Sequence, residues 1–224
     1  MKQPLAYVHP EAKVAENVVI EPFVTVDQDV VIGEGTRIGS SVTILPGTRI
    51  GKNCTIFPGA VIGAIPQDLK FKGEYTTVEI GDNNTIREYV TINRGTSSKG
   101  KTKLGDGNLI MAYVHIAHDC TLGNYIILVN NTQLAGEVVV DDWAIISGMT
   151  GIHQFCRVGS HVMIGGGSLV RKDVPPFIKA SREPLSYVGI NSIGLRRRNY
   201  SNEKIREVQE IYRYIYQKGL NTAQ

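Results

Sequence analysis

The sequence predicts an all-β solenoid, a parallel β-helix, followed by a short α-helical tail. An aliphatic residue returns at every sixth position from Val8 to Ile62, then at Ile80, Ile86 and Ile92, and again from Leu104 to Val170. Glycine is frequent, with 24 in 224 residues, whereas aromatic residues make up only 7%. A period of six does not fit an α-helix, but it fits short strands that alternate inward and outward and end in turns.

A second inward position falls four residues after each aliphatic one, where the side chain is usually small or β-branched, as at Val18, Thr48 and Ala60. Two inward positions in six residues describe one flat side of a triangular prism, so three repeats make a coil of about 18 residues. Coils stack about 4.8 Å apart, and the stack buries a core that no single repeat could bury. The pattern predicts a prism over residues 1–176.

Two polar insertions interrupt the predicted prism, and a helical tail follows it. The first insertion lies near residues 64–77 and contains PQDLKFKGEY, and the second lies near 97–103 with the sequence SSKGKTK. Loops held by a rigid scaffold are common places for binding residues. The paired prolines 175–176 predict the end of the ladder. Residues 177–224 are predicted to form a linker and a C-terminal helical segment, with Ser201 as helix cap.

Composition and charge exclude several classes of protein. A net charge of +3 is too small to indicate a nucleic-acid-binding protein. No apolar run approaches the ~20 residues that cross a bilayer, so we expect no stable membrane insertion. The N-terminal residues lack the apolar segment of a signal peptide. We therefore expect a cytoplasmic protein.

The cysteines and two of the histidines suggest no chemistry. Cys54, Cys120 and Cys156 all lie in the inward phase, so we expect small core residues rather than a nucleophile. An odd number of cysteines without an export signal also argues against a disulfide framework. His9 and His161 lie in outward phases without neighbouring functional groups, and we expect both at the surface.

The other three histidines raise the question of a metal site. His115 and His118 form an H-x-x-H pair, and the γ-class carbonic anhydrases, which share this kind of prism, bind zinc through three histidines. Within one chain His153 lies two coils beyond the pair, about 10 Å away, whereas zinc ligands lie ~2 Å from the ion. A neighbouring subunit could supply a third histidine, so a zinc site stays the weaker alternative and we expect no metal.

His118 is the stronger candidate for catalysis. Gly136 lies 18 residues later, one coil above it in the same outward column. A glycine there leaves its backbone N–H open to close approach. A base with an amide donor ~5 Å away is the arrangement that acyl transfer requires. The alternative is that His118 is a solvated turn residue. The spacing to Gly136 alone does not decide between the two, because outward glycines are common in this sequence.

Several segments of the sequence carry a resemblance to a known family: IGAIPQDLKFKGE, TINRGT, HIAHDC, LAGEV, GMTGIHQFCRVG, DVPP and GLRRR. Together they resemble the UDP-N-acetylglucosamine acyltransferase family, and the resemblance covers residues 8–217. The resemblance implies a left-handed β-helix, although ~98% of parallel crossovers are right-handed. It implies transfer of an (R)-3-hydroxyacyl group from acyl carrier protein to the 3-hydroxyl of UDP-N-acetylglucosamine, the first step of lipid A biosynthesis. It also implies a homotrimer with active sites between subunits, and no cofactor besides the phosphopantetheine that carries the donor.

Residue by residue, the resemblance makes His118 the general base, oriented by Asp119, with Gly136 as the oxyanion donor. Gly166 matches the position at which the family limits the acyl chain, and glycine implies a groove open to chains of about fourteen carbons or more. The family's other contacts to the sugar, the pantetheine, the nucleotide phosphates and the carrier protein fall on Asp68, Lys70, His115, His153, Gln154, Asn191, Arg197 and Arg198.

Some positions depart from the family pattern. Asn93 and Glu137 stand where histidine is frequent, and Ile193 stands where an acidic residue helps to read the uracil. These departures concern nucleotide recognition rather than the proposed base. The family also carries a longer helical tail than this sequence.

Other functions remain open alongside this resemblance. One alternative is a zinc-dependent hydratase like the γ-class carbonic anhydrases, which metal analysis of the purified protein would identify. A non-catalytic scaffold is a second alternative, since solenoids often serve as binding surfaces, but a scaffold would not need HIAHDC, HQFC and two polar insertions. A related N-acyltransferase, which acts on the next lipid A intermediate, usually carries an extra N-terminal domain, whereas the repeat here begins at Val8.

Overall fold

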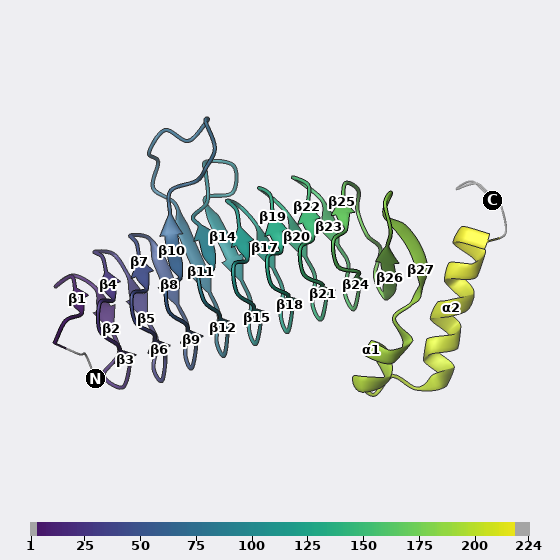
Figure 1. Ribbon diagram of the computed structural model, residues 1–224, viewed down its shortest axis with the longest axis horizontal. Coiled ribbons are helices and arrows are strands. Elements are labelled where there is room, and N and C mark those ends of the chain that lie inside the picture. The colour runs from purple at the N-terminus through teal and green to yellow at the C-terminus, as the bar shows by residue number, and fades with distance from the viewer. Residues whose placement is uncertain (1–3, 218–224) are drawn as a thin grey trace.

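The computed structural model describes residues 4–217, which form a long triangular prism with two helices at its C-terminal end (Figure 1). The chain passes through three sheets in turn, and neighbouring coils pair in parallel. His115 lies beside Gln133 and Ile116 beside Leu134, which is a register of one 18-residue coil. The parallel β-helix predicted from the six-residue period is confirmed.

Nearly all strands are two to four residues long, and each sheet supplies one side of the prism. Sheet 1 contains β1 (Tyr7–Val8), β4 (Thr25–Val26), β7 (Thr43–Ile44), β10 (Val61–Ala64), β13 (Thr91–Asn93), β16 (His115–Ile116), β19 (Gln133–Leu134), β22 (Gly151–Ile152) and β25 (Leu169–Val170). Sheet 2 contains β2 (Lys13–Val14), β5 (Val31–Ile32), β8 (Thr48–Ile50), β11 (Thr77–Ile80), β14 (Lys101–Leu104), β17 (Thr121–Leu122), β20 (Val139–Val140) and β23 (Arg157–Val158). Sheet 3 contains β3 (Val19–Ile20), β6 (Arg37–Ile38), β9 (Thr55–Ile56), β12 (Thr85–Ile86), β15 (Leu109–Ile110), β18 (Ile127–Leu128), β21 (Ile145–Ile146), β24 (Met163–Ile164), β26 (Ile178–Ser181) and β27 (Ser186–Ile190).

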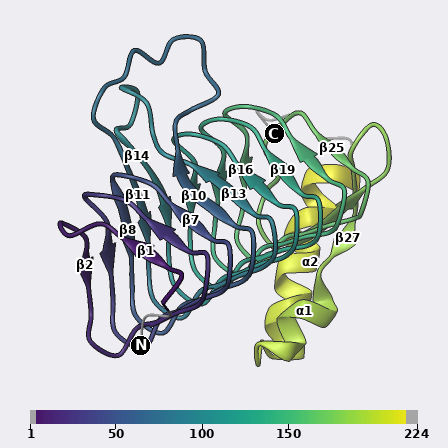
Figure 2. The same ribbon diagram turned by 60° about the vertical axis from the view of Figure 1, so that its left-hand side comes forward.

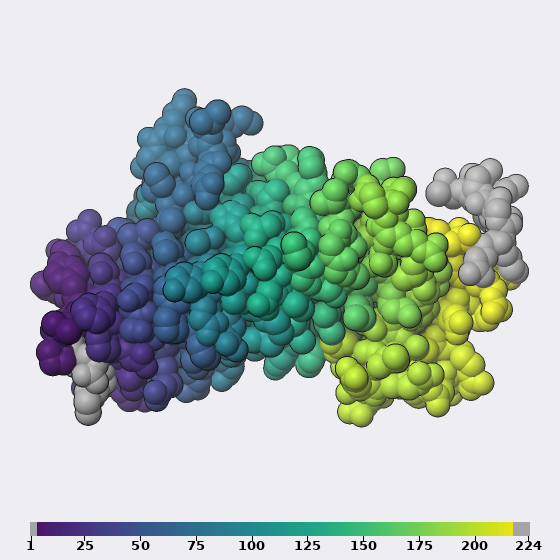
Figure 3. Space-filling model, in the orientation of Figure 1, coloured from purple at the N-terminus to yellow at the C-terminus, as the bar shows by residue number. Residues whose placement is uncertain are grey.

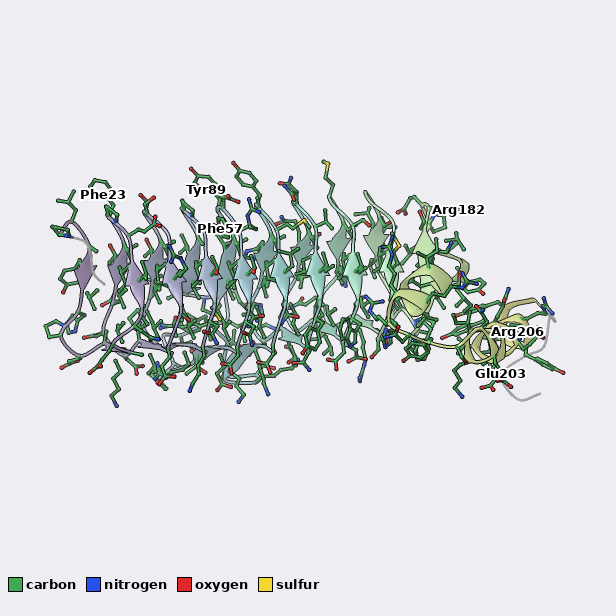
Figure 4. All side chains as sticks on the ribbon, turned by 90° about the horizontal axis from the view of Figure 1, so that it is seen from below. Phe23, Phe57, Tyr89, Arg182, Glu203 and Arg206 are labelled. Atoms are coloured by element: carbon green, nitrogen blue, oxygen red, sulfur yellow. The ribbon has the colours of Figure 1, made fainter. Side chains whose placement is uncertain are left out.

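Three rows of turns form the edges of the prism. Corner 1 joins sheet 1 to sheet 2, corner 2 joins sheet 2 to sheet 3, and corner 3 joins sheet 3 to sheet 1. In the coil that begins with β16 these corners are residues 117–120, 123–126 and 129–132. Figure 4 shows Phe23, Phe57 and Tyr89 projecting along corner 3.

The interior of the prism is a column of aliphatic side chains. Ile62, Ile92 and Ile116, successive inward residues of sheet 1, are fully buried. The three cysteines are buried in the same column, as their phase predicted. Burial raises the pKa of the Cys120 thiol to about 12, so this residue stays protonated near neutral pH and is not a nucleophile.

Both insertions leave the prism at corner 1, and their bounds differ from the prediction. The first loop, residues 65–76, connects β10 to β11. The second loop, residues 94–100, connects β13 to β14, whereas 97–103 was predicted. Residues 101–103 stay in the sheet because Thr102 is fully buried and continues the inward phase toward Leu104. Figures 1 and 2 show the loops rising from the same edge, and Figure 3 shows the first as a lobe above the surface.

The sheet continues beyond the paired prolines, so the prediction of a linker from residue 177 was wrong. β26 pairs in parallel with β24, and β27 then turns back antiparallel to β26. Pro175 and Pro176 lie where sheet 2 ends, and only a single bridge joins Val174 to Val158 there. The chain re-enters sheet 3 because Ile178 and Ala180 alternate inward and are buried.

Two helices follow the last strand. α1 (Ser192–Arg197) is short, and α2 (Asn202–Gln217) lies across the end of the prism. Ser201 caps α2 as predicted, since its hydroxyl accepts a hydrogen bond from the backbone N–H of Lys204 at 3.1 Å. The sequence Lys218-Gly219, which is typical of a helix end, lies outside the described residues. Between residues 4 and 217, neither helix is long and apolar enough to cross a membrane.

The prediction that His161 is a surface residue was wrong. Its ring is stacked in an aromatic column at corner 2, between Trp143 at 6.4 Å and Phe177 at 5.5 Å between ring centroids. The hydroxyl of Tyr200 lies 3.2 Å from Nε2 of His161. The phase is outward, but the segment around α1 covers this corner, and burial lowers the pKa of His161 below the usual value for histidine.

Candidate active site

A groove of about 560 Å³ runs along corner 1 and the adjoining edge of sheet 1. It spans several coils, from β16 to β25, and one residue of the first loop also reaches it. Its lining residues are Gln67, His115, Ala117, His118, Gln133, Leu134, Ala135, Gly136, Gly151, Ile152, His153, Gln154, Leu169, Val170 and Arg171. The groove therefore brings together His115, His118, Gly136, His153 and Gln154, which the sequence placed in one site.

The imidazole of His118 is fixed by its neighbour. Nδ1 of His118 lies 2.9 Å from Oδ2 of Asp119, and the Asp119 side chain is fully buried. Because an ionised carboxylate only accepts hydrogen bonds, Nδ1 carries the proton of a neutral imidazole and Nε2 keeps its lone pair. His118 is therefore arranged to accept a proton at Nε2.

The carboxylate of Asp119 is in turn held by the second loop. Its Oδ1 accepts from the backbone N–H groups of Thr96 at 3.0 Å and Lys99 at 3.2 Å. Its Oδ2 accepts from the hydroxyl of Thr96 at 2.6 Å. These donors satisfy the acceptor oxygens of a carboxylate that has no access to water. Thr96 is not among the residues predicted from the sequence, although it lies at the end of the TINRGT segment.

Gly136 lies directly against the base. A Cβ built on Gly136 would lie 2.5 Å from both Nε2 and Cε1 of His118 and 3.1 Å from Nε2 of Gln154. No side chain fits between the two coils at this point, so glycine is required. Among the described residues, no hydrogen-bond acceptor pairs with the Gly136 N–H, although the next amide, of Glu137, donates to the carbonyl of His118 at 2.9 Å.

The first loop brings an acidic group to the same imidazole. Oδ2 of Asp68 lies 3.8 Å from Nε2 of His118, and Asp68 also caps its own loop by accepting from the N–H of Lys70 at 2.9 Å. Asn93 fastens the loop to the prism, because its Nδ2 donates to the carbonyl of Ile65 at 3.1 Å. The predicted residue Lys70 is exposed beside the groove rather than in its lining.

The other two histidines line the groove but have separate partners. Nδ1 of His115 lies 2.8 Å from the hydroxyl of Thr91. Burial, together with the neighbouring imidazole of His118, lowers the pKa of His115 below its usual value, which favours the neutral form of His115 near pH 7. Nδ1 of His153 lies 3.1 Å from the carbonyl oxygen of Gln154. Within residues 4–217, no three His, Cys, Asp or Glu side chains are grouped to hold a metal ion.

Several predicted residues lie outside this groove in the single chain. Asn191 caps α1 by accepting from the N–H of Gly194 at 3.2 Å, and it is buried. Arg198 stacks on Trp143 at 5.0 Å and donates to two backbone carbonyls. Arg197 is exposed on α1, and Gly166 is exposed at corner 3.

Comparison with known proteins gives a consistent result. A family model described as UDP-N-acetylglucosamine O-acyltransferase, domain 2, matches residues 173–224, and one described as bacterial transferase hexapeptide matches residues 101–136. A further one, described as GMPPB C-terminal domain, matches residues 2–67. An acyl-[acyl-carrier-protein]–UDP-N-acetylglucosamine O-acyltransferase from Halorhodospira halophila is 47% identical over 97% of this chain and 84% of its own length.

Solved structures agree with these relatives. A UDP-N-acetylglucosamine acyltransferase from Bacteroides fragilis is 61% identical with a TM-score of 0.99, over 100% of this chain and 88% of that chain. The enzyme from Francisella novicida is 47% identical with a TM-score of 0.98, over 100% of this chain and 82% of that chain. The predicted fold class, a left-handed parallel β-helix with a helical C-terminus, is confirmed.

Proposed function

We propose, from the premise that this chain belongs to the UDP-N-acetylglucosamine O-acyltransferase family, that the groove beside His118 is its active site. The chain is an O-acyltransferase of lipid A biosynthesis that transfers an (R)-3-hydroxyacyl group from acyl carrier protein to the 3-hydroxyl of UDP-N-acetylglucosamine. The observation that carries the site assignment is the contact of His118 with Gly136 on one side and Asp119 on the other.

The acceptor chemistry explains why a base is needed. A sugar hydroxyl is a poor nucleophile near neutral pH, whereas the leaving thiol of the donor has a pKa of ~8.5. Nε2 of His118 takes the hydroxyl proton while the oxygen attacks the thioester carbonyl. The tetrahedral intermediate then collapses and expels the thiolate, which takes the proton back from His118. Only a proton and an acyl group move, so the proposal requires no cofactor beyond the phosphopantetheine thiol.

The negative charge of the intermediate needs a hydrogen-bond donor. The Gly136 N–H is free to supply one beside Nε2 of His118. One such donor contributes about 3–4 kcal/mol, and general-base catalysis about 100- to 10,000-fold. Asp119 keeps the imidazole in the required tautomer. The remaining acceleration comes from holding two large substrates in register.

The reaction itself is the direct test. Purified protein would be incubated with UDP-N-acetylglucosamine and 3-hydroxyacyl carrier proteins of several chain lengths, and the acylated nucleotide would be measured by mass spectrometry. We expect a product with one added hydroxyacyl group and release of the free carrier-protein thiol in equal amount. Absence of product with every donor would overturn the proposed function.

We propose Arg197 as the side chain available to contact the nucleotide diphosphate. A guanidinium grips phosphate through two parallel hydrogen bonds, and Arg197 is exposed. Arg198 is committed to Trp143 and to the carbonyl of Gly194. We therefore assign Arg198 the role of fixing α1 so that Arg197 faces the ligand.

We propose a homotrimer because two faces of the prism are complementary. The groove opens on sheet 1, while Leu109, Ile127 and Ile145 form a half-exposed apolar stripe on the outer face of sheet 3. His118 lies at corner 1 and Gly166 at corner 3, the two edges of sheet 1, so a second copy packed against sheet 1 would enclose an acyl chain between the two prisms. A rigid prism whose sheet 1 faces sheet 3 of the next copy closes a three-fold ring.

Replacing Ile145 with aspartate should dissociate the trimer, because it buries a charge in the apolar contact. Light scattering at micromolar concentration should give a monomer, with activity lost. Thr121→Asp on sheet 2, the face left outside the ring, is the matched control and should remain trimeric. A wild-type protein that is active as a monomer would refute the assembly.

Replacing Gly166 with methionine should shorten the preferred acyl chain. A Cβ at this position meets the carbonyl oxygen of Gly148 at 3.2 Å, so a small adjustment accommodates it. We propose that the rest of the side chain enters the acyl groove between subunits. Each excluded CH₂ costs about 0.8 kcal/mol, so blocking two of them disfavours the long donor roughly tenfold. Competing donors of ten to sixteen carbons would measure the shift, with KM for the nucleotide sugar as internal control. Unchanged selectivity would show that another residue sets the length.

A further inference from the structure

We infer that Glu137 is a positioning residue for this reaction. It holds the second loop over Asp119, and Asp119 in turn orients the imidazole of His118. The inference rests on the proposed function, because it concerns the orientation of His118. Glu137 touches neither the imidazole nor the Gly136 N–H through its side chain. Its carboxylate acts through the second loop, and the loop acts through Asp119.

The second loop closes over Asp119 by several hydrogen bonds. Thr96 contributes its N–H and its hydroxyl to the carboxylate, and Lys99 contributes its N–H. The ammonium group of Lys99 also donates to the backbone carbonyl of Asp119 at 3.2 Å. Nδ1 of His118 then takes the remaining position on Oδ2. A displacement of the loop would therefore leave the buried carboxylate short of donors and free the imidazole to turn.

Glu137 holds the loop from the coil above. It lies 18 residues after Asp119, so it is the next residue in the same column of corner 1. Oε1 of Glu137 accepts from the hydroxyl of Ser98 at 3.1 Å, and Oε2 lies 3.8 Å from Nζ of Lys99. The N–H of Ser98 donates to the hydroxyl of Thr96 at 3.1 Å. The contacts thus form one continuous chain from Glu137 to Asp119.

The ion pair differs from an ordinary surface pair. The Glu137 side chain is only 18% exposed, compared with 39% for Glu79 in its pair with Lys101. Exposed pairs contribute little because water screens them. The ends of the loop are fastened to strands β10 and β11 by backbone hydrogen bonds, in which the N–H of Arg94 donates to Ala64 and the N–H of Gly95 donates to Thr77. Nearer the tip, the N–H of Ser97 donates to Glu74 of the first loop at 2.9 Å. At the tip of the loop, Glu137 therefore adds a side-chain attachment to the prism that is separate from Asp119.

The experiment compares Glu137→Ala with the conservative Glu137→Gln and with the control Glu79→Ala. In Glu137→Ala we expect kcat to fall about tenfold to a hundredfold, as misplacement of a catalytic group does, with KM for the nucleotide sugar unchanged. Amide hydrogen exchange at Thr96 and Lys99 should become faster. Glu137→Gln keeps an acceptor for Ser98 and should retain most of kcat, and Glu79→Ala should match the wild type.

A second background tests whether the effect passes through Asp119. In an Asp119→Asn protein, Glu137→Ala should lower kcat by much less than in the wild type. An equal fall in both backgrounds, or an unchanged kcat despite faster exchange in the loop, would overturn the inference. If the wild type itself forms no product, the proposed function fails. Unchanged amide hydrogen exchange at Thr96 in Glu137→Ala would independently overturn the role of Glu137 in holding the loop.

Discussion

Replacing His118 with alanine is expected to lower kcat by about a hundredfold to ten-thousandfold, because the acceptor hydroxyl loses its general base. The side chain is 8% exposed and packs between Asp119, Gly136 and the first loop rather than in the aliphatic column. The core of the prism is therefore untouched, and thermal unfolding and subunit assembly should match the wild type. The residual rate reports the contribution of substrate positioning and of the oxyanion donor.

The measurement is a steady-state rate with saturating nucleotide sugar and carrier-bound donor. His153→Ala is the comparison within the same groove, since the imidazole of His153 lies against the carbonyl of its neighbour Gln154. We expect His153→Ala to act mainly on KM and His118→Ala mainly on kcat. A correctly assembled His118→Ala protein with near-normal turnover would show that another group removes the proton.

Replacing Gly136 with alanine is expected to cost about a hundredfold in kcat, the typical effect of displacing a catalytic group by about 1 Å. The added methyl carbon would lie 2.5 Å from Nε2 and Cε1 of His118, so the imidazole has to move. The backbone N–H remains, and so does the possibility of binding the oxyanion. The loss therefore measures the displacement of the base rather than the removal of the donor.

The double variant makes this interpretation testable. When His118 is already alanine, the methyl group at position 136 has nothing to displace, so Gly136→Ala should lower the residual rate only slightly. The melting temperature of each variant would control for folding. An additive loss in the double variant would mean that Gly136 acts on the substrate independently of His118.

The sequence predicted the parts of the molecule that repeat. Burial at Ile62, Ile92 and Ile116 depends on residues in the same phase of neighbouring coils, so a period of six is sufficient to place them. The same arithmetic placed His118 beneath Gly136, because an outward column advances by 18 residues. Neither prediction required knowledge of the loops.

The parts outside the repeat could not be predicted in this way. Thr96 and Asp119 are 23 residues apart and meet only because the second loop folds back over corner 1. His161 has an outward phase but is buried because Tyr200, 39 residues later, packs against it. The strand Ile178–Ser181 returns to sheet 3 after two prolines. In each case a contact distant in sequence overrides the local pattern.

Because each coil adds a fixed rise, the height of Gly166 above His118 along the prism is set by the number of coils between them. The two residues are 48 positions apart, which is two full coils and two further sides of the prism. Insertion or deletion of a coil between them would move the end of the proposed acyl groove by about 4.8 Å at once. The accepted length of the acyl chain therefore changes in large steps when coils are added or removed. Smaller changes have to come from single side chains at the end of the proposed groove.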